Sequence, residues 1–298
     1  MSWIGFVTSP HYPADPLTPI PFRLELGSAP PTMKMTTIVK TFLSLLVASS
    51  EAIPQTSLKP TQNQTSALVL VGKAFKEAET IEYELDRLRS LKFIARTQAR
   101  AGDLPAAMKT IERIQKEATS ERSRKLCLPG AYSGIAFAQA RAGDLKAAFD
   151  TVEKGGTDVL EIVSAQAETT GIADAMKTVD LKIDRKIRDF ALQNISRSRA
   201  KIGDFKGAIQ VADMIQSISI KEDTYGSISA VQALNGDSSS SQRSLARIAN
   251  PSTREAFEKV IKDGPLTETK VAILPTAFER CDGYLNIACF LLDTDNKQ

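Results

Sequence analysis

One short motif recurs five times along this chain, and it limits the possible folds more than any other feature. In each copy an isoleucine is followed by an alanine five residues later and by a small residue thirteen residues later. The isoleucines are Ile94, Ile135, Ile162, Ile195 and Ile228. Successive copies are 41, 27, 33 and 33 residues apart, so one boundary is displaced within a period of 33 to 34 residues. A repeat of this length indicates stacked supersecondary units.

Each period divides into two helices and a turn. In the first copy Ile94, Ala95 and Ala99 share one face of a helix, and after the turn Ala107 and Ile111 do the same. Glycine can adopt the left-handed conformation that ends a helix, and aspartate can cap the next one. Four of the isoleucines are followed by such a Gly-Asp turn: Gly102-Asp103, Gly143-Asp144, Gly203-Asp204 and Gly236-Asp237. In the third copy Thr170-Gly171 stands in its place. A single pair could not bury its isoleucine face, so neighbouring copies must stack.

The spacing resembles that of the tetratricopeptide repeat, a helix-turn-helix unit of 34 residues. Ile94, Ala95, Leu104 and Ala107 stand where that family has its leucine, small, aromatic and alanine positions. The chain departs from the family by lacking its proline in every copy and by replacing its preferred tyrosine with Gln98, Gln139, Gln166, Arg199 and Gln232. The resemblance covers residues 86–250. We expect an all-α fold, a right-handed α-solenoid of about five such repeats with helical caps, the repeats and the amino-terminal cap occupying residues 66–250.

The first 65 residues have a different character. Residues 1–32 are rich in proline and are interpreted as a disordered leader, translated from a start assigned too early. Residues 33–52 combine lysines, a short apolar run and a small-residue exit, which is typical of a signal peptide. The run is too short to span a membrane. If translation starts at Met33 or Met35, we expect export to the periplasm or outside the cell; otherwise the protein is cytoplasmic. Residues 53–65 are predicted to be a disordered tether.

Residues 251–298 are predicted to form a carboxy-terminal helical cap. A stripe from Ala277 to Leu292 recurs at helical steps and is expected to cover the apolar face of the last repeat. Cys281 and Cys289 on one helix would lie about 12 Å apart, too far for a disulfide. They are therefore expected to be buried thiols, unless Gly283 breaks the helix and lets them pair.

The inventory of reactive side chains argues against catalysis. The single histidine, His11, lies in the leader, so the repeats lack the commonest general base and zinc ligand. No phosphate-binding loop or Cys-x-x-Cys pair occurs. Asp103, Asp144 and Asp204 recur at turns, which favours capping over acid chemistry. We expect no catalytic residues, metal or cofactor. The alternative is an exported enzyme built on a helical toroid that uses a pair of carboxylates.

The resemblance implies a binding surface. In tetratricopeptide arrays the first helices line a concave groove, and the corresponding steps here carry mostly basic side chains, together with one aromatic ring: Lys92, Arg96, Arg100, Phe137, Arg141, Arg197 and Lys201. Guanidinium groups suit carboxylates, so we expect a protein or peptide partner with an acidic or carboxylate-ended segment. The row is interrupted in the third copy by Leu160, Ser164 and Glu168 and in the fifth by Gly226, Ala230 and Leu234.

Other partners are expected to be excluded. The formal net charge is only +3, and aromatic residues are not interleaved with the basic ones, which argues against nucleic acid. Apart from the signal peptide, no segment is expected to span a membrane. Solvated helix faces without a partner remain the alternative reading of the basic row.

Overall fold

The computed structural model describes residues 61–265 and 267–294. The chain divides into two units, Met1–Lys59 and Pro60–Gln298, and all described residues belong to the second unit. The predicted leader and signal peptide, and residues 53–60 of the predicted tether, lie outside the described residues.

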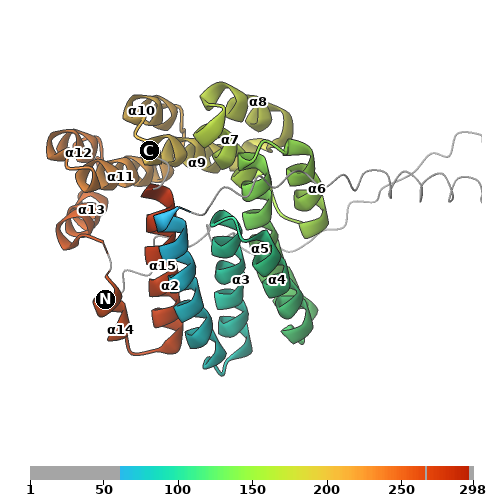
Figure 1. Ribbon diagram of the computed structural model, residues 1–298. Helices are drawn as coiled ribbons and strands as arrows, with labels where there is room; N and C mark the ends of the chain where they lie inside the picture. The colour runs from blue at the N-terminus through green and yellow to red at the C-terminus, as the bar shows by residue number, and fades with distance from the viewer. Residues whose placement is uncertain (1–60, 266, 295–298) are drawn as a thin grey trace, which may run out of the picture. The chain divides into compact units, whose positions relative to one another are not determined.

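Within these ranges the regular secondary structure is entirely helical, as predicted (Figure 1). A 3-10 turn, η2 (Arg185–Ile187), precedes α9. The helices are α2 (Gln62–Glu79), α3 (Glu84–Arg100), α4 (Leu104–Glu117), α5 (Glu121–Arg141), α6 (Leu145–Gly155), α7 (Leu160–Thr169), α8 (Ile172–Lys182), α9 (Arg188–Lys201), α10 (Phe205–Asp213), α11 (Ile218–Leu234), α12 (Ser238–Leu245), α13 (Pro251–Asp263), α14 (Glu268–Ala272) and α15 (Ala277–Thr294).

The turns lie at the predicted glycines. Gly102, Gly143, Gly203 and Gly236 have φ between 81° and 91°, a conformation that side chains with a Cβ rarely adopt. The aspartate after each glycine accepts a hydrogen bond from a backbone N–H three residues on, as Asp144 does from Ala147 at 3.0 Å. In the third copy Gly171 takes the positive φ, and no side chain caps α8. Each turn reverses the chain into a helix pair, and we call the pairs α3/α4, α5/α6, α7/α8, α9/α10 and α11/α12 the sequential pairs.

Burial follows the repeated motif. All five isoleucines are buried, Ile135 being the most exposed at 5%. The small residues of the second helices are buried as well, namely Ala107, Ala148, Ala175, Ala208 and Ser241. Small side chains at these places let the two helices of a pair approach closely, as predicted.

The pairs stack in chain order. The first helices α3, α5, α7, α9 and α11 each pack against the next, and each second helix packs against its own first helix. α13 continues the series by packing against α11 and α12. The buried side chains accordingly form local clusters, one spanning α7 to α11 and another α9 to α13.

The glutamines at the family's tyrosine position have a structural role that the sequence did not reveal. Thr110 donates a hydrogen bond to Gln98 Oε1 at 2.8 Å, and Thr151 and Ser244 do the same to Gln139 and Gln232. Each bond ties a first helix to its second helix across twelve residues. In the fourth copy Arg199 bonds Asp204 in the turn and the carbonyl of Ala167. In the third copy no donor reaches Gln166 Oε1.

The amino-terminal cap begins earlier than predicted. α2 starts at Gln62 because Thr61 Oγ1 accepts from Gln64 N–H, while Gln64 Oε1 accepts from Thr61 N–H. This reciprocal capping box satisfies two donors at the helix start. Residues 61–65, assigned to the tether on composition, therefore belong to the folded unit.

The carboxy-terminal segment differs from the expectation. α13 does cover α11, but α15 packs against α2 and α3, at the opposite end of the chain order. Its buried residues Cys281, Leu285, Ala288 and Leu292 join the cluster formed by α2 to α5. None of the cysteines forms a disulfide; Cys127 and Cys281 are buried and Cys289 is half-buried. Among the described helices, none is both long and apolar enough to cross a bilayer.

Candidate binding surface on the first helices

The predicted basic row lies on three of the first helices. Lys92, Arg96 and Arg100 are on α3, Phe137 and Arg141 on α5, and Arg197 and Lys201 on α9. The six cations are half-buried, whereas Phe137 is 1% exposed. The Arg100 guanidinium stacks over the Phe137 ring, 4.8 Å from its centroid. Phe137 therefore supports Arg100 from below and presents no open face to a partner, unlike the prediction.

Arg96 is engaged within the protein. Its guanidinium forms an ion pair with Glu161 of α7, and the two side chains are only 22% and 14% exposed. To reach α7 from α3, Arg96 passes α5 at Gly134. A Cβ on Gly134 would lie 2.6 Å from Arg96 Cα and 2.9 Å from its Cγ, so only glycine fits. The pair thus links the first and third sequential pairs across the second.

Arg197 is engaged in the same manner. Its Nη2 lies 2.6 Å from Asp223 Oδ2 on α11, and its Nε donates to Ser227 Oγ at 3.2 Å. Gln193 also donates to Asp223 Oδ2, at 3.0 Å. Arg96 and Arg197 both stand two residues after the isoleucine of their copies. The structure therefore makes this position a link between first helices rather than an open cation.

Lys92 lies between α3 and α5. Its alkyl stem lies over Gly130, where a Cβ would come within 2.7 Å of Lys92 Cδ, and its Nζ is 4.4 Å from the Phe93 ring centroid. Burial lowers the pKa of Lys92, and the charges of Arg96 and Arg89 lower it further. Gly130 and Gly134, one helical turn apart, are the signal in the sequence that could have revealed this close approach of α3 and α5.

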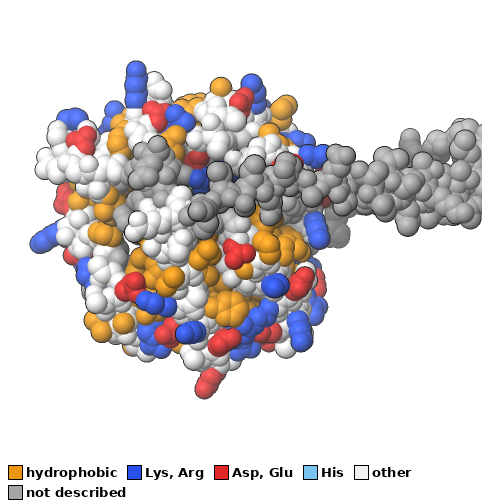
Figure 2. All heavy atoms as spheres, viewed as in Figure 1, with side chains coloured by type: hydrophobic (Ala, Val, Ile, Leu, Met, Phe, Trp, Pro, Cys, Tyr) orange, Lys and Arg blue, Asp and Glu red, His pale blue; other side chains and the backbone are white. Residues whose placement is uncertain are grey.

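Acidic groups adjoin the row. Burial raises the pKa of Asp158, although the Leu160 N–H and Arg96 act in the opposite direction. Glu161 and Asp223 compensate two of the arginines, and Figure 2 shows acidic and basic side chains interspersed over the face in view. Because Glu161 lies on α7 and Asp223 on α11, the first helices carry acidic as well as basic side chains.

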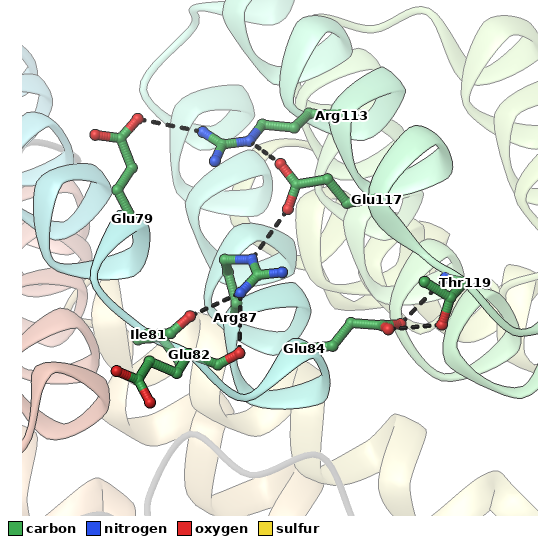
Figure 3. A network of polar contacts seen from close by, with 8 residues as sticks. All are labelled: Glu79, Ile81, Glu82, Glu84, Arg87, Arg113, Glu117 and Thr119. Carbon is green, nitrogen blue, oxygen red and sulfur yellow. Dashed lines mark hydrogen bonds and ion pairs between the residues drawn. The ribbon is translucent and has the colours of Figure 1, made fainter.

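A second polar network lies at the start of the array (Figure 3). Arg87 of α3 and Arg113 of α4 both donate to Glu117, and Arg113 also reaches Glu79 of α2 at 3.5 Å. Burial would raise the pKa of Glu117, but the bonds from Arg113 and Arg87 outweigh it and lower the pKa. Arg87 further donates to the carbonyls of Ile81 and Glu82. These contacts join α2, α3 and α4, so the charged side chains of this network have a structural role.

Carboxylates also set the spacing between successive pairs. Asp189 accepts from the backbone N–H groups of Gln216 and Ser217, and Glu222 from those of Ala249 and Asn250, at 2.8 to 3.2 Å. Each acid stands six residues before the isoleucine of its copy. Glu84 holds Thr119 in the first pair in a related way. Sequence reasoning missed these acids because they do not recur in every copy.

One shallow depression of about 310 Å³ lies where α2, α3 and α4 meet. Its lining comprises Phe75, Gln98, Ala106, Lys109, Thr110 and Arg113. Arg113 stacks on Phe75 at 5.0 Å and is bound by Glu117 and Glu79, so its charge is already compensated. Over residues 61–265 and 267–294, no group of three His, Cys, Asp or Glu side chains could hold a metal ion.

Comparison with known proteins assigns no role to these residues. No protein-family model, no curated protein and no solved structure matches the chain. The resemblance to tetratricopeptide repeats therefore rests on the motif and on its place in the helix pairs.

Proposed function

We propose that this protein is a non-catalytic scaffold, a right-handed solenoid of tetratricopeptide-like repeats, which binds an acidic or carboxylate-ended segment of another protein. The observation that supports it most is the placement of Arg100, Arg141 and Lys201. Each stands six residues after the isoleucine of its copy, on first helices of the stacked series, and each is half-exposed. An extended segment running across these helices would meet Arg100 and Arg141 on adjacent helices, and would reach Lys201 after passing α7, which carries Glu168 at the equivalent step.

The contacts of Arg96, Arg197 and Arg100 support a division of the row into structural and recognition residues. Arg96 and Arg197 are compensated by Glu161 and Asp223, so we assign them to holding the first helices together. Arg100 has a rigid support in Phe137, which limits the side-chain freedom that binding would remove. A guanidinium group that is partly shielded and bonds a carboxylate with two parallel N–H groups contributes about 1.5 to 3 kcal/mol. We assign recognition to Arg100 and Arg141 because they stand at the same step of adjacent first helices, with Lys92 and Lys201 at the sides.

The test is a direct binding measurement. Fluorescein-labelled acidic peptides with a free carboxylate end, their amidated counterparts and a basic peptide of equal length are titrated with the protein and followed by anisotropy. We expect the acidic peptides to bind, the free carboxylate more tightly. The double change Arg100→Glu and Arg141→Glu should weaken binding at least a hundredfold without changing the helical signal.

The matched control changes charge elsewhere. Lys109 and Lys116 are exposed on α4, a second helix, and Lys109→Glu with Lys116→Glu makes the same change in net charge. This variant should bind like the wild type. An equal loss of affinity in both variants would show that the peptide responds only to the net charge of the protein. An undiminished affinity of the arginine variant would place the site elsewhere.

The alternative is an exported enzyme that uses carboxylates. It is favoured by Asp158, before α7, and Asp282, on α15, because burial raises the pKa of both. Neither group contributes to the shift of the other, which argues against a catalytic pair. An activity that is abolished by Asp158→Asn and by Asp282→Asn separately would favour the enzyme over the scaffold.

Export is part of the proposal. Expression from Met35 should give a processed protein outside the cytoplasm, with its first residue near Ile53. Amino-terminal sequencing of the product measures this, and an unprocessed cytoplasmic chain would contradict the signal-peptide interpretation while leaving the binding proposal intact.

A further inference from the structure

The two ends of the described chain form a helix pair of their own. α15 packs against α2, and Arg280 near its start pairs at 2.9 Å with Glu77 near the end of α2, so the helices are antiparallel. In Figure 1 the end of α15 lies beside the start of α2. α15 also packs against α3, as each first helix of the series packs against the next. We call α15/α2 the composite pair.

α2 has the pattern of a second helix. Ala74, Ala78 and Ile81 stand 33 residues before Ala107, Ile111 and Ile114 of α4, and all six are buried. α15 has the pattern of a first helix. Its Ile287-Ala288 matches the Ile-Ala step of the first two copies, and Tyr284 precedes Ile287 as Tyr132 and Tyr225 precede Ile135 and Ile228.

The composite pair differs from the sequential pairs in its connection. Every sequential pair is joined by a short turn, whereas α15 reaches α2 only through noncovalent contacts. It is connected instead to α13 through residues 264–276, in which Gly264 has a φ of +66° and the described residues include one short helix, α14. Polar contacts to α2 and α3 include the ion pairs of Arg280 with Glu77 and of Glu268, on α14, with Lys73. Thr97 Oγ1 lies 3.6 Å from Cys289 Sγ, and the Cys281 thiol hydrogen-bonds Ser90 of α3.

We propose that α15 detaches from the folded array as a unit, and that the face of α2 and α3 which it covers accepts an α15 helix in trans, as a second copy of this chain would supply. The covered face is apolar, with Ala67, Leu70, Val71, Leu88 and Leu91 in the cluster that α15 completes. An amphipathic helix seated in an apolar groove is a recurring mode of recognition. α13 keeps the last sequential pair covered when α15 leaves, so detachment does not require the array to unfold.

Three native cysteines allow detachment to be measured on the full chain. Cys281 on α15 and Cys127 on α5 are both 0% exposed, so each reacts with a thiol reagent only when its helix opens. Cys127 reports opening of the array and Cys281 reports opening of α15. Labelling is quenched at intervals and each cysteine is quantified by mass spectrometry. We expect Cys281 and Cys289 to react at least tenfold faster than Cys127.

A pair of arginine variants sharpens the measurement. Arg280 and Arg254 each donate to a carbonyl six residues earlier, those of Leu274 and Ile248, but only Arg280 also pairs with α2. Arg280→Gln should raise the labelling rate of Cys281 several-fold and leave that of Cys127 unchanged. Arg254→Gln should leave the rate of Cys281 unchanged.

Acceptance in trans is tested with a labelled peptide of residues 277–294 in which Cys281 and Cys289 are replaced by alanine. It should bind the full chain saturably and speed labelling of Cys281, while a peptide that also carries Ala288→Glu should not bind. Equal labelling rates for Cys281 and Cys127 would overturn the proposal, because α15 would then open only with the array. Absence of peptide binding would overturn it as well.

Discussion

The sequential pairs and the composite pair place similar helices in contact by different means. In α5/α6, Gly143 and Asp144 reverse the chain and cap the second helix within three residues. In α15/α2, the two helices come from opposite ends of the described chain and meet without such a turn. The comparison shows that two helices can have the apolar faces of a helix pair, and pack together, without the short turn that joins the sequential pairs. Stability should therefore be shared through the array in the first case and local in the second.

Overpacking should give the largest difference between the two kinds of pair. Ala167 and Ala288 are both 0% exposed, in a sequential and in the composite pair respectively. Either change to leucine should cost about 1 to 3 kcal/mol. Ala167→Leu should lower the midpoint of global unfolding, measured by circular dichroism. Ala288→Leu should chiefly accelerate labelling of Cys281; equal shifts in the global midpoint would show that the composite pair is no more local than the others.

Alkaline pH should act on the composite pair, by an amount that grows with pH. Burial raises the pKa of Cys281 to about 12 from an ordinary value of 9.0. A detached or unfolded chain therefore loses the proton first, so stability from this thiol is complete below about pH 9 and falls as the pH rises towards 12. One proton corresponds to about 1.4 kcal/mol per pH unit. The fraction of molecules with α15 open, measured by hydrogen exchange, should rise with pH over this range. The variant Cys281→Ala should lose this dependence on pH.

Removing a turn cap should have a smaller effect, confined to a sequential pair. Asp144 accepts the N–H of Ala147, and Asp144→Ala should cost about 1 kcal/mol of unfolding free energy. Lys109→Ala, an exposed site on α4, should change it by less than about 0.5 kcal/mol. Chemical denaturation measures both. If the two variants change the free energy of unfolding equally, the aspartates of the turns do not stabilise the protein as helix caps.

The helix pairs could be predicted in detail because their signals are local. The isoleucines, the small residues and the glycine turns all lie where the repeat predicts them. The candidate site was less predictable. Its residues could be placed on first helices, but neither the ion pair of Arg96 with Glu161 nor the burial of Phe137 beneath Arg100 follows from spacing. Both depend on which side chain of another helix comes within reach.

The sequence by itself determined the helices, their turns and their apolar faces, because each depends on residues within a few positions of one another. Only the tertiary structure decided that α15 covers α2 and α3, since an apolar stripe specifies that a face is buried and not which face covers it. The same holds for the charges. Two members of the predicted basic row form internal ion pairs, Arg96 with Glu161 and Arg197 with Asp223, and Arg96 reaches its partner where Gly134 lets α3 approach α5.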